Sequence, residues 1–245
     1  MYDPRFEKSR GRILMWLLNK TRGFFQIQLS PVSHTERLIS VAGGFLGIFL
    51  VMLVSTTFLD GADATLIIAS MGASAVLLFA VPHSALSQPW SLVGGHVLSA
   101  LIGIACAKFI PYPLIAAASA VSIAIGAMHL LKCIHPPGGA TALTAVVGGD
   151  AVHSLGFQFV LTPVLINVVA ILVVAVIFGL PFSWRRYPVA WSRSPSVTRQ
   201  HASPYADISH ADFVAALSEM DTFIDVTEDD LLRIYNHVTR TNSST

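Results

Sequence analysis

Long apolar runs separated by short polar breaks dominate the chain between residues 38 and 181. A helix of about 20 apolar residues crosses the hydrocarbon core of a bilayer. Four runs approach or reach that length, at residues 38–59, 90–110, 114–131 and 157–180. Two other apolar segments, residues 64–81 and 135–149, are shorter than most of these runs. We therefore predict an all-α polytopic membrane protein with about six membrane segments.

Glycine marks both of the shorter segments, together with serine in the first and proline in the second. The first carries Gly72-Ala73-Ser74 near its middle, and the second opens with HPPGG at residues 135–139. In hydrocarbon a backbone N–H or C=O group that loses its partner is costly, so a broken helix persists only where protein or a watery cavity surrounds it. These segments are predicted to be short or broken, and their meeting point is predicted to line a substrate path.

The order of long and short segments repeats along the chain. A long, a short and a long segment are followed by a second such set, and the short members carry GASA at residues 72–75 and GATA at residues 139–142. Three crossings per repeat invert the second copy, and paired interrupted segments mark the binding site of many transporters. Inverted 3+3 repeats are one explanation. Chance is the other, because such tetrads are common in membrane helices.

Composition and charge support the membrane assignment. The chain is 53% hydrophobic and 12% charged, with a mean hydropathy of +0.65, which is too apolar for an ordinary soluble domain. The net charge of +1 gives no basic surface for nucleic acid. Cys106 and Cys133 lack metal-ligand spacing and are interpreted as small packing residues.

Most charged residues lie on either side of the membrane domain, which covers residues 38–181. Residues 1–37 carry several arginines and lysines around one short apolar stretch, which predicts an interfacial amphipathic segment. Residues 184–187 form an aromatic and basic cluster. By the positive-inside rule both flanks are cytoplasmic, and a prokaryotic plasma membrane is expected. An even number of crossings follows: six if both short segments cross, four if both re-enter. We expect six.

Composition changes again after the last long segment. Residues 182–203 are rich in serine, proline and arginine and predict a linker. Ser209 with Asp212, and Thr227 with Asp230, resemble the starts of two short capped helices. Residues 204–245 are therefore predicted to form a small cytoplasmic helical tail.

A small anion inside a bilayer needs partial positive charge without a fixed cation that traps it. The N-terminus of a half-helix offers unpaired N–H groups and about half a positive charge. Proline suits the first helical turn, and glycine lets a ligand approach the backbone. The residues with these properties, which we take as candidate substrate-binding residues, are Pro136, Pro137, Gly138, Gly139 and Thr141, with Gly72 and Ser74 from the other short segment.

Three further polar residues in the apolar region complete the candidate site. His135 either lends charge when protonated, which couples anion passage to protons, or donates to a backbone carbonyl and fixes the broken helix. His96 is either a polar residue of helix packing or a contact in the path. Asn167 either makes an interhelical hydrogen bond or contacts the substrate.

These motifs together resemble the HPP family of integral membrane proteins, which is named after His-Pro-Pro. The resemblance rests on HPPGGATAL at residues 135–143, GASAVLLF at residues 72–79 and GGH at residues 94–96, and it covers roughly residues 38–181. It implies a link to nitrite transport across cyanobacterial and chloroplast membranes. Some members of the family carry soluble regulatory domains after the membrane part, whereas this chain has only a short tail.

Several other classes of function are weighed against anion passage. Hydrolase and phosphate-loop motifs do not occur, and the apolar region contains no glutamate, so we expect no enzymatic activity, no catalytic residue and no cofactor. A divalent metal transporter is a rival, because five histidines lie in this region, although none has i, i+4 ligand spacing. A sensor or assembly module that acts through its tail is another. We expect a homo-oligomeric transporter or channel for a small inorganic monovalent anion, with nitrite as the leading candidate.

Overall fold

A computed structural model describes residues 33–58 and 61–192 of the chain. Within these ranges every regular element is a helix or a helical turn, which confirms the all-α prediction. The elements are α2 (His34–Phe58), α3 (Gly61–Ala80), η1 (Ala85–Ser87), α4 (Pro89–Phe109), α5 (Pro113–Leu130), α6 (Pro136–Val147), α7 (Asp150–Leu155), η2 (Val160–Leu165), α8 (Ile166–Gly179), η3 (Ser183–Arg185) and η4 (Val189–Ser192). The predicted amphipathic stretch before residue 33 and the predicted tail at residues 204–245 lie outside the described residues.

Four helices of the described part are long and apolar enough to cross a membrane. They cover His34–Thr57, Pro89–Phe109, Pro113–Leu130 and Val160–Gly179. α3 contributes a shorter apolar stretch, Ile67–Ala80, and α6 has 12 residues. The structure therefore supports four spanning helices, while the prediction of six crossings and of inverted repeats stays a prediction.

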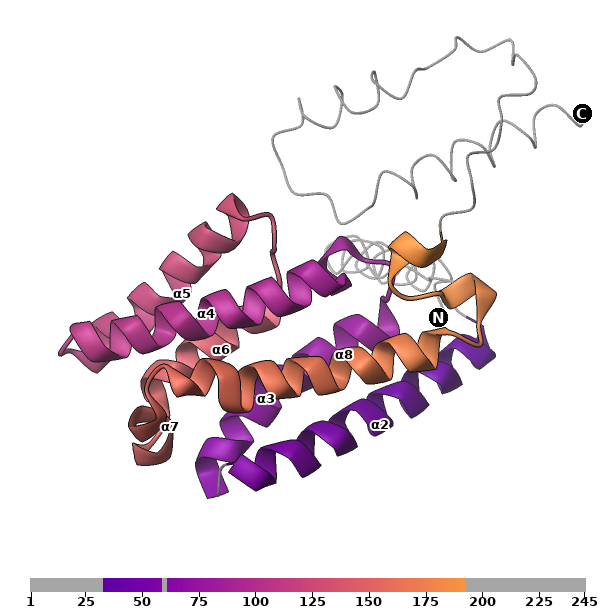
Figure 1. Ribbon diagram of the computed structural model, residues 1–245. Helices are drawn as coiled ribbons and strands as arrows, with labels where there is room; N and C mark the ends of the chain where they lie inside the picture. Colours follow the sequence, from indigo (N-terminus) through magenta and orange to yellow (C-terminus); the bar gives the residue numbers. More distant parts are fainter. Residues whose placement is uncertain (1–32, 59–60, 193–245) are drawn as a thin grey trace, which may run out of the picture. The chain divides into compact units, whose positions relative to one another are not determined.

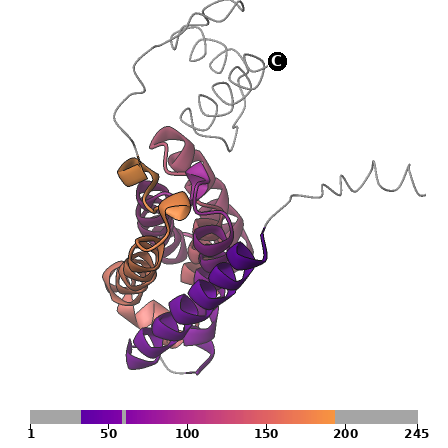
Figure 2. The same ribbon diagram turned by 90° about the vertical axis from the view of Figure 1, so that its right-hand side faces the viewer.

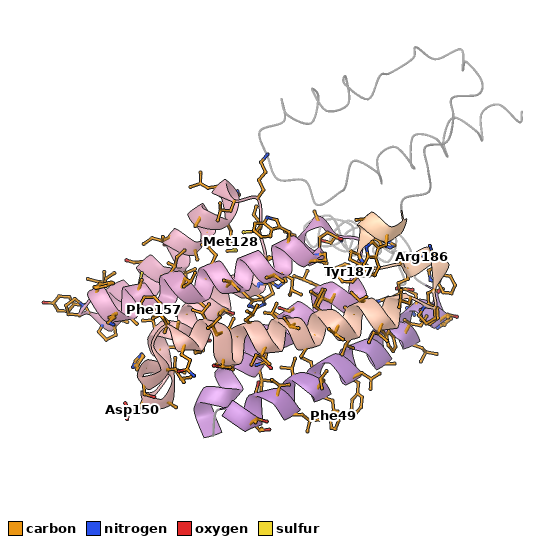
Figure 3. All side chains as sticks on the ribbon, viewed as in Figure 1. Phe49, Met128, Asp150, Phe157, Arg186 and Tyr187 are labelled. Atoms are coloured by element: carbon orange, nitrogen blue, oxygen red, sulfur yellow. The ribbon has the colours of Figure 1, made fainter. Side chains whose placement is uncertain are left out.

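The helices pack as a central group with further helices around it. α4, α5 and α6 contact one another, and α3 and α8 pack against this group (Figure 1). α2 runs along the outer side of α8 in both views (Figures 1 and 2). Glycines on α2 allow it to approach both α3 and α8, since a Cβ at Gly43 would lie 2.5 Å from the Phe79 ring, on α3, and 3.1 Å from the Phe178 ring, on α8. Large apolar side chains such as Phe49 (Figure 3) are exposed on the outer face of α2, as in a helix that faces lipid.

Proline positions explain where several helices begin. Pro89, Pro113 and Pro136 each occupy the first turn of a helix, where the missing N–H is not needed. Residues 131–135 are not helical and separate α5 from α6, at the place where the sequence predicts an interruption. In this stretch Lys132 has a φ of 53°, in the left-handed region, and it turns the chain away from α5.

Two expectations about helix continuity are wrong. α3 is a continuous helix through Gly72 and Ser74, so the first short segment is not broken. The last segment, expected as one helix over residues 157–180, is kinked: Thr162 has φ −131° and ψ 111°, and a cis bond joins it to Pro163. Proline inside the run removes a backbone donor and interrupts the helix there.

Candidate functional site

Glycines on α4 bring the chain between α5 and α6 into close contact with that helix. A Cβ at Gly95 would lie 2.5 Å from the Cβ of His135, and one at Gly94 would lie 2.9 Å from the Cβ of Cys133. No side chain larger than hydrogen fits at Gly95 without a shift. The GGH motif therefore serves to seat His135 directly beside the helix that carries His96.

His135 caps α6 and uses both nitrogens of its ring. Its Nδ1 lies 2.9 Å from the backbone oxygen of Leu86, in η1, and its Nε2 lies 2.9 Å from the Oγ of Ser74, on α3. The side chain has no exposed surface. The contact with Leu86 supports the interpretation that His135 fixes the start of the broken helix, and the contact with Ser74 extends its role beyond that.

His96 completes a chain of hydrogen bonds across four elements. Its Nε2 lies 2.8 Å from the same Ser74 Oγ, and its Nδ1 lies 2.7 Å from the Oγ1 of Thr141, on α6. The centroids of the two imidazole rings are 4.9 Å apart. We call Ser74, His96, His135 and Thr141 the polar cluster. It unites four of the predicted site residues, from the two short segments and from the GGH motif.

The polar cluster is closed off from the surface and lies among apolar side chains. The exposed fraction is 0% for three of its members and 2% for Thr141. Buried side chains of α3 and α4, among them Met71, Leu78 and Leu92, pack in the apolar core beside it. A hydrogen-bonded network in surroundings of low dielectric is strong when every member has a partner, and here each ring nitrogen has one.

The first turn of α6 offers fewer free donors than the sequence suggested. Pro136 and Pro137 have no N–H, and the N–H of Gly138 donates to the His135 carbonyl at 2.8 Å. A Cβ at Gly138 would lie 2.8 Å from the Gly95 oxygen. The anion site of two half-helix N-termini is therefore corrected: α3 has no such terminus, and α6 has a partly occupied one.

Three predicted site residues lie apart from the polar cluster. Gly72 sits inside α3, where an added Cβ would meet nothing within 4 Å. Gly139 is half-buried, and an added Cβ would meet only Val121, at 4.0 Å. Asn167 donates to the Oγ of Ser55, on α2, at 2.8 Å, which is the interhelical hydrogen bond considered from the sequence.

Two polar groups at the site were not predicted. The Leu86 carbonyl has no sequence signal, because any residue supplies a backbone oxygen. Ser99 is fully buried, its Oγ has no hydrogen-bond partner, and it would lie 2.9 Å from a Cβ at Gly138. The four-residue spacing from Gly95 to Ser99 to Gly103 places all three on one face of α4, and that spacing is the signal that could have found Ser99.

A segment after α8, residues 185–189, binds the turn that contains Leu86; we call it the strap. The hydroxyl of Tyr187 donates to the Ser87 carbonyl at 2.7 Å, and the Val189 N–H donates to the Gln88 side chain at 3.2 Å. The buried Arg185 donates to the Phe79 carbonyl at the end of α3. Tyr187 and Arg186 lie at this end of the helices (Figure 3). The strap thus fixes the turn whose carbonyl holds His135.

The histidines within residues 33–58 and 61–192 do not gather into a metal centre. Among the described side chains, no group of three or more His, Cys, Asp or Glu residues lies close enough together to hold a metal ion. His153 bonds the Val146 carbonyl at 3.1 Å, and His129 is exposed at the end of α5. The described histidines therefore occupy separate places, apart from the pair in the polar cluster.

Comparison with known proteins places these motifs in a family. Residues 29–188 match the family described as HPP, transmembrane region. A transmembrane protein of Dictyostelium discoideum is 32% identical over 197 residues, which are 77% of this chain and 69% of that protein. A second is 38% identical over 151 residues, 60% of this chain and 48% of that protein. No solved structure matches the chain. With the polar cluster built from its HPP and GGH motifs, the chain belongs to the HPP family of integral membrane proteins.

Proposed function

We propose that the protein transports a small inorganic monovalent anion across the membrane, with nitrite as the leading candidate, and that the polar cluster is its site. One observation carries this proposal: two fully buried histidines share one serine hydroxyl at the place where the chain breaks between α5 and α6. Ionisable residues inside a membrane domain are costly and mark substrate or proton paths.

The chemistry of imidazole suits a monovalent anion. A neutral histidine pair can be buried among apolar helices, and one added proton gives the site a single positive charge. That charge and one monovalent anion neutralise each other, so the loaded site carries no net charge through the bilayer. A lysine or arginine at the same place would keep its charge and hold the anion after delivery.

Hydroxyl groups near the histidines supply the directional contacts. Ser74 and Thr141 already touch the rings, and the Ser99 hydroxyl is buried without a partner beside the start of α6. A buried polar group with no partner is costly unless a ligand or water satisfies it. Ser99 is therefore the group we expect to meet an anion oxygen first.

The closed state of the polar cluster favours a carrier over an open channel. The exposed fractions of its members are 0% to 2%, so an anion reaches it only when helices part. Membrane carriers move in this way, by alternating access to a site near the midplane. We retain as part of the proposal a homo-oligomer, cytoplasmic flanks on both sides of residues 38–181 and a plasma membrane location. A sensor role for the tail concerns residues outside the described ranges.

The test is nitrite flux into vesicles that contain the purified full chain, at two transmembrane pH differences. We expect flux well above that of empty vesicles, which report nitrous acid crossing the lipid by itself. His135→Gln keeps a polar side chain but cannot be protonated, and it should lower the protein-dependent flux by about tenfold or more.

The matched control is Thr144→Ala. The Thr144 hydroxyl is also nearly buried on α6 but donates only to the Ala140 carbonyl of its own helix, at 2.8 Å. The nitrite flux per folded protein should be the same in Thr144→Ala as in the unchanged chain. Zinc or manganese uptake is measured in parallel. Metal uptake without nitrite flux would replace this proposal with the histidine-lined metal transporter.

A further inference from the structure

We propose that the polar cluster is a proton relay whose hydrogen bonds run in one fixed direction in the neutral state, and that it delivers one proton from Thr141 through His96 and Ser74 to His135. The relay deepens the proposed function: it makes the proton the second substrate of the anion site. Its geometry does not depend on the identity of the anion, because every contact in it is made by the chain itself.

The Leu86 carbonyl fixes the direction of the relay. A carbonyl oxygen only accepts, so the Nδ1 of His135, 2.9 Å away, must carry a hydrogen. In the neutral ring the other nitrogen, Nε2, then has none and accepts. Its partner at 2.9 Å is the Ser74 hydroxyl, which therefore donates its one hydrogen to His135 and not to the more distant Ser70 carbonyl of its own helix, at 3.3 Å.

The same argument continues through His96. Because the Ser74 hydrogen is used by His135, the 2.8 Å contact between Ser74 and His96 needs the hydrogen of His96 Nε2. In neutral His96 the Nδ1 then carries no hydrogen, and it accepts from the Thr141 hydroxyl at 2.7 Å. One backbone oxygen thus sets both tautomers: Nδ1–H in His135 and Nε2–H in His96.

When one proton is added, each of the three hydrogen bonds between Thr141 and His135 exchanges its donor and acceptor, and none of them is lost. A proton that binds the Thr141 oxygen releases the Thr141 hydrogen to His96 Nδ1. His96 Nε2–H then passes its hydrogen to Ser74, and Ser74 passes its own to His135 Nε2. Three transfers follow the incoming proton, and each breaks one O–H or N–H bond and forms another. The net result is one proton on His135.

The protonated state finds acceptors that are already in place. His135 keeps its bond to Leu86 and now donates from Nε2 to Ser74, which donates to His96 Nε2. His96 donates from Nδ1 to Thr141, whose hydroxyl turns to the Pro137 carbonyl, 3.5 Å away. This long contact has no use in the neutral chain, because Thr141 has one hydrogen and His96 takes it. It is the acceptor that the relay needs after protonation.

The surroundings limit the relay to one proton. Two charged rings with centroids 4.9 Å apart would repel strongly in a medium of low dielectric. Elsewhere on the elements packed against the rings, α4 has Lys108 in its last turn, over the Phe157 ring, and α5 has the exposed His129. Among the described side chains of α3, α4, α5, α6, η1, η2 and α8, these are the remaining Lys, Arg, His, Asp or Glu residues.

Nitrogen-15 NMR of labelled histidine in the full chain in lipid bilayers, without any anion substrate, tests the relay directly. At high pH we expect His96 as the Nε2–H tautomer and His135 as the Nδ1–H tautomer. On acidification His135 should become doubly protonated while His96 changes to Nδ1–H at the same pH. His96→Gln and His135→Gln assign the signals. His96 as Nδ1–H at high pH, or a His96 that titrates independently, would overturn the relay.

Ser74→Ala and Thr144→Ala separate the relay from simple packing. Ser74→Ala removes the link between the rings, so His96 should no longer respond when His135 is protonated, whereas Thr144→Ala should keep the paired change. A paired change that survives in Ser74→Ala would contradict the assigned route.

Vesicle measurements with a pH-sensitive dye then connect the relay to transport. We expect about one proton to enter with each nitrite, the ratio set by one charge per site. Nitrite flux without proton movement would overturn proton coupling and leave the anion proposal standing. If the two histidines change together but the protein passes no nitrite, the relay would stand. The proposal that nitrite is the transported anion would then be overturned.

Discussion

The two short segments with related sequences reach the same histidine by different backbone routes. Ser74 comes from the middle of the continuous helix α3, and Thr141 comes from the first turns of α6, just after the chain breaks. Each brings a hydroxyl to one nitrogen of His96, at 2.8 Å and 2.7 Å. The similarity of GASA and GATA thus predicts a shared side-chain role and not a shared backbone conformation.

The difference lies in the glycine that precedes the motif. Gly72 of α3 and its counterpart Gly139 of α6 both have room for a Cβ, whereas Gly138, directly before GATA, is pressed against the backbone of Gly95. The break before α6 needs close approach to α4, since residues 133–135 have to lie on that helix. α3 needs no such approach, because its hydroxyl already points to the histidines from a regular helix.

Alanine at Gly138 and at Gly72 should give opposite results, and this is the largest effect we expect. Gly138→Ala forces a Cβ to within 2.8 Å of a backbone oxygen and should cost about 1–3 kcal/mol, seen as a lower melting temperature in detergent. Gly72→Ala should stabilise α3 by about 0.5–1 kcal/mol, the usual gain inside a helix. Equal losses in both variants would mean that the two glycines have the same role.

Removal of the Ser74 hydroxyl should lower nitrite flux more than removal of the Thr141 hydroxyl. Ser74→Ala breaks contacts to both histidines and should lower nitrite flux by about tenfold, the equivalent of about 1.4 kcal/mol. Thr141→Val removes a contact to one histidine and should have a smaller effect. Initial flux per folded protein measures both. A larger loss in Thr141→Val would place the main substrate contact on α6.

Tyr187, which bonds the turn after α3, should make the stability of the protein depend on pH in the alkaline range. Burial raises the pKa of the Tyr187 phenol above its ordinary value of about 10. The folded state then holds this proton more tightly than the unfolded state, so stability should fall as the pH rises above that ordinary value. Tyr187→Phe should remove this alkaline slope and cost about 1 kcal/mol at neutral pH. Melting temperatures measured from pH 7 to high pH test both effects.

The polar pair between α2 and α8 should contribute least. Asn167→Leu removes the hydrogen bond to Ser55 and should cost about 0.6 kcal/mol, the average for such bonds between membrane helices. Ser55→Ala should cost a similar amount, and the double variant should cost little more. Nitrite flux per folded protein should stay unchanged. A large loss of flux in Asn167→Leu would indicate that Asn167 contacts the substrate.

The sequence predicted most of the helical framework because hydropathy and proline positions act locally. The long apolar runs became α2, α4, α5 and the η2 and α8 pair, and the helix after His135 begins at Pro136 as expected. The continuity of α3 was missed, since glycine does not by itself end a helix in a membrane domain. The kink at Thr162 had a signal in Pro163 that the apolar character of the run outweighed.

The site was predicted in part for a similar reason. Ser74, His96, His135 and Thr141 stood out by residue type and motif, but their order in one chain of bonds depends on tertiary packing across 22 to 61 residues. The contribution of Leu86 comes from backbone alone, which carries no sequence signal. Motifs could identify the participants, whereas the partner of each ring nitrogen follows only from the packing of the helices.

The strap has a mechanical consequence for the histidines. Leu86 bonds His135 on one side, and its neighbour Ser87 bonds Tyr187 on the other. A displacement of residues 185–189 would therefore be transmitted through one residue, Ser87, to the carbonyl that holds the His135 ring. Movement of the strap would therefore shift the Leu86 carbonyl and change the hydrogen bond at the Nδ1 of His135.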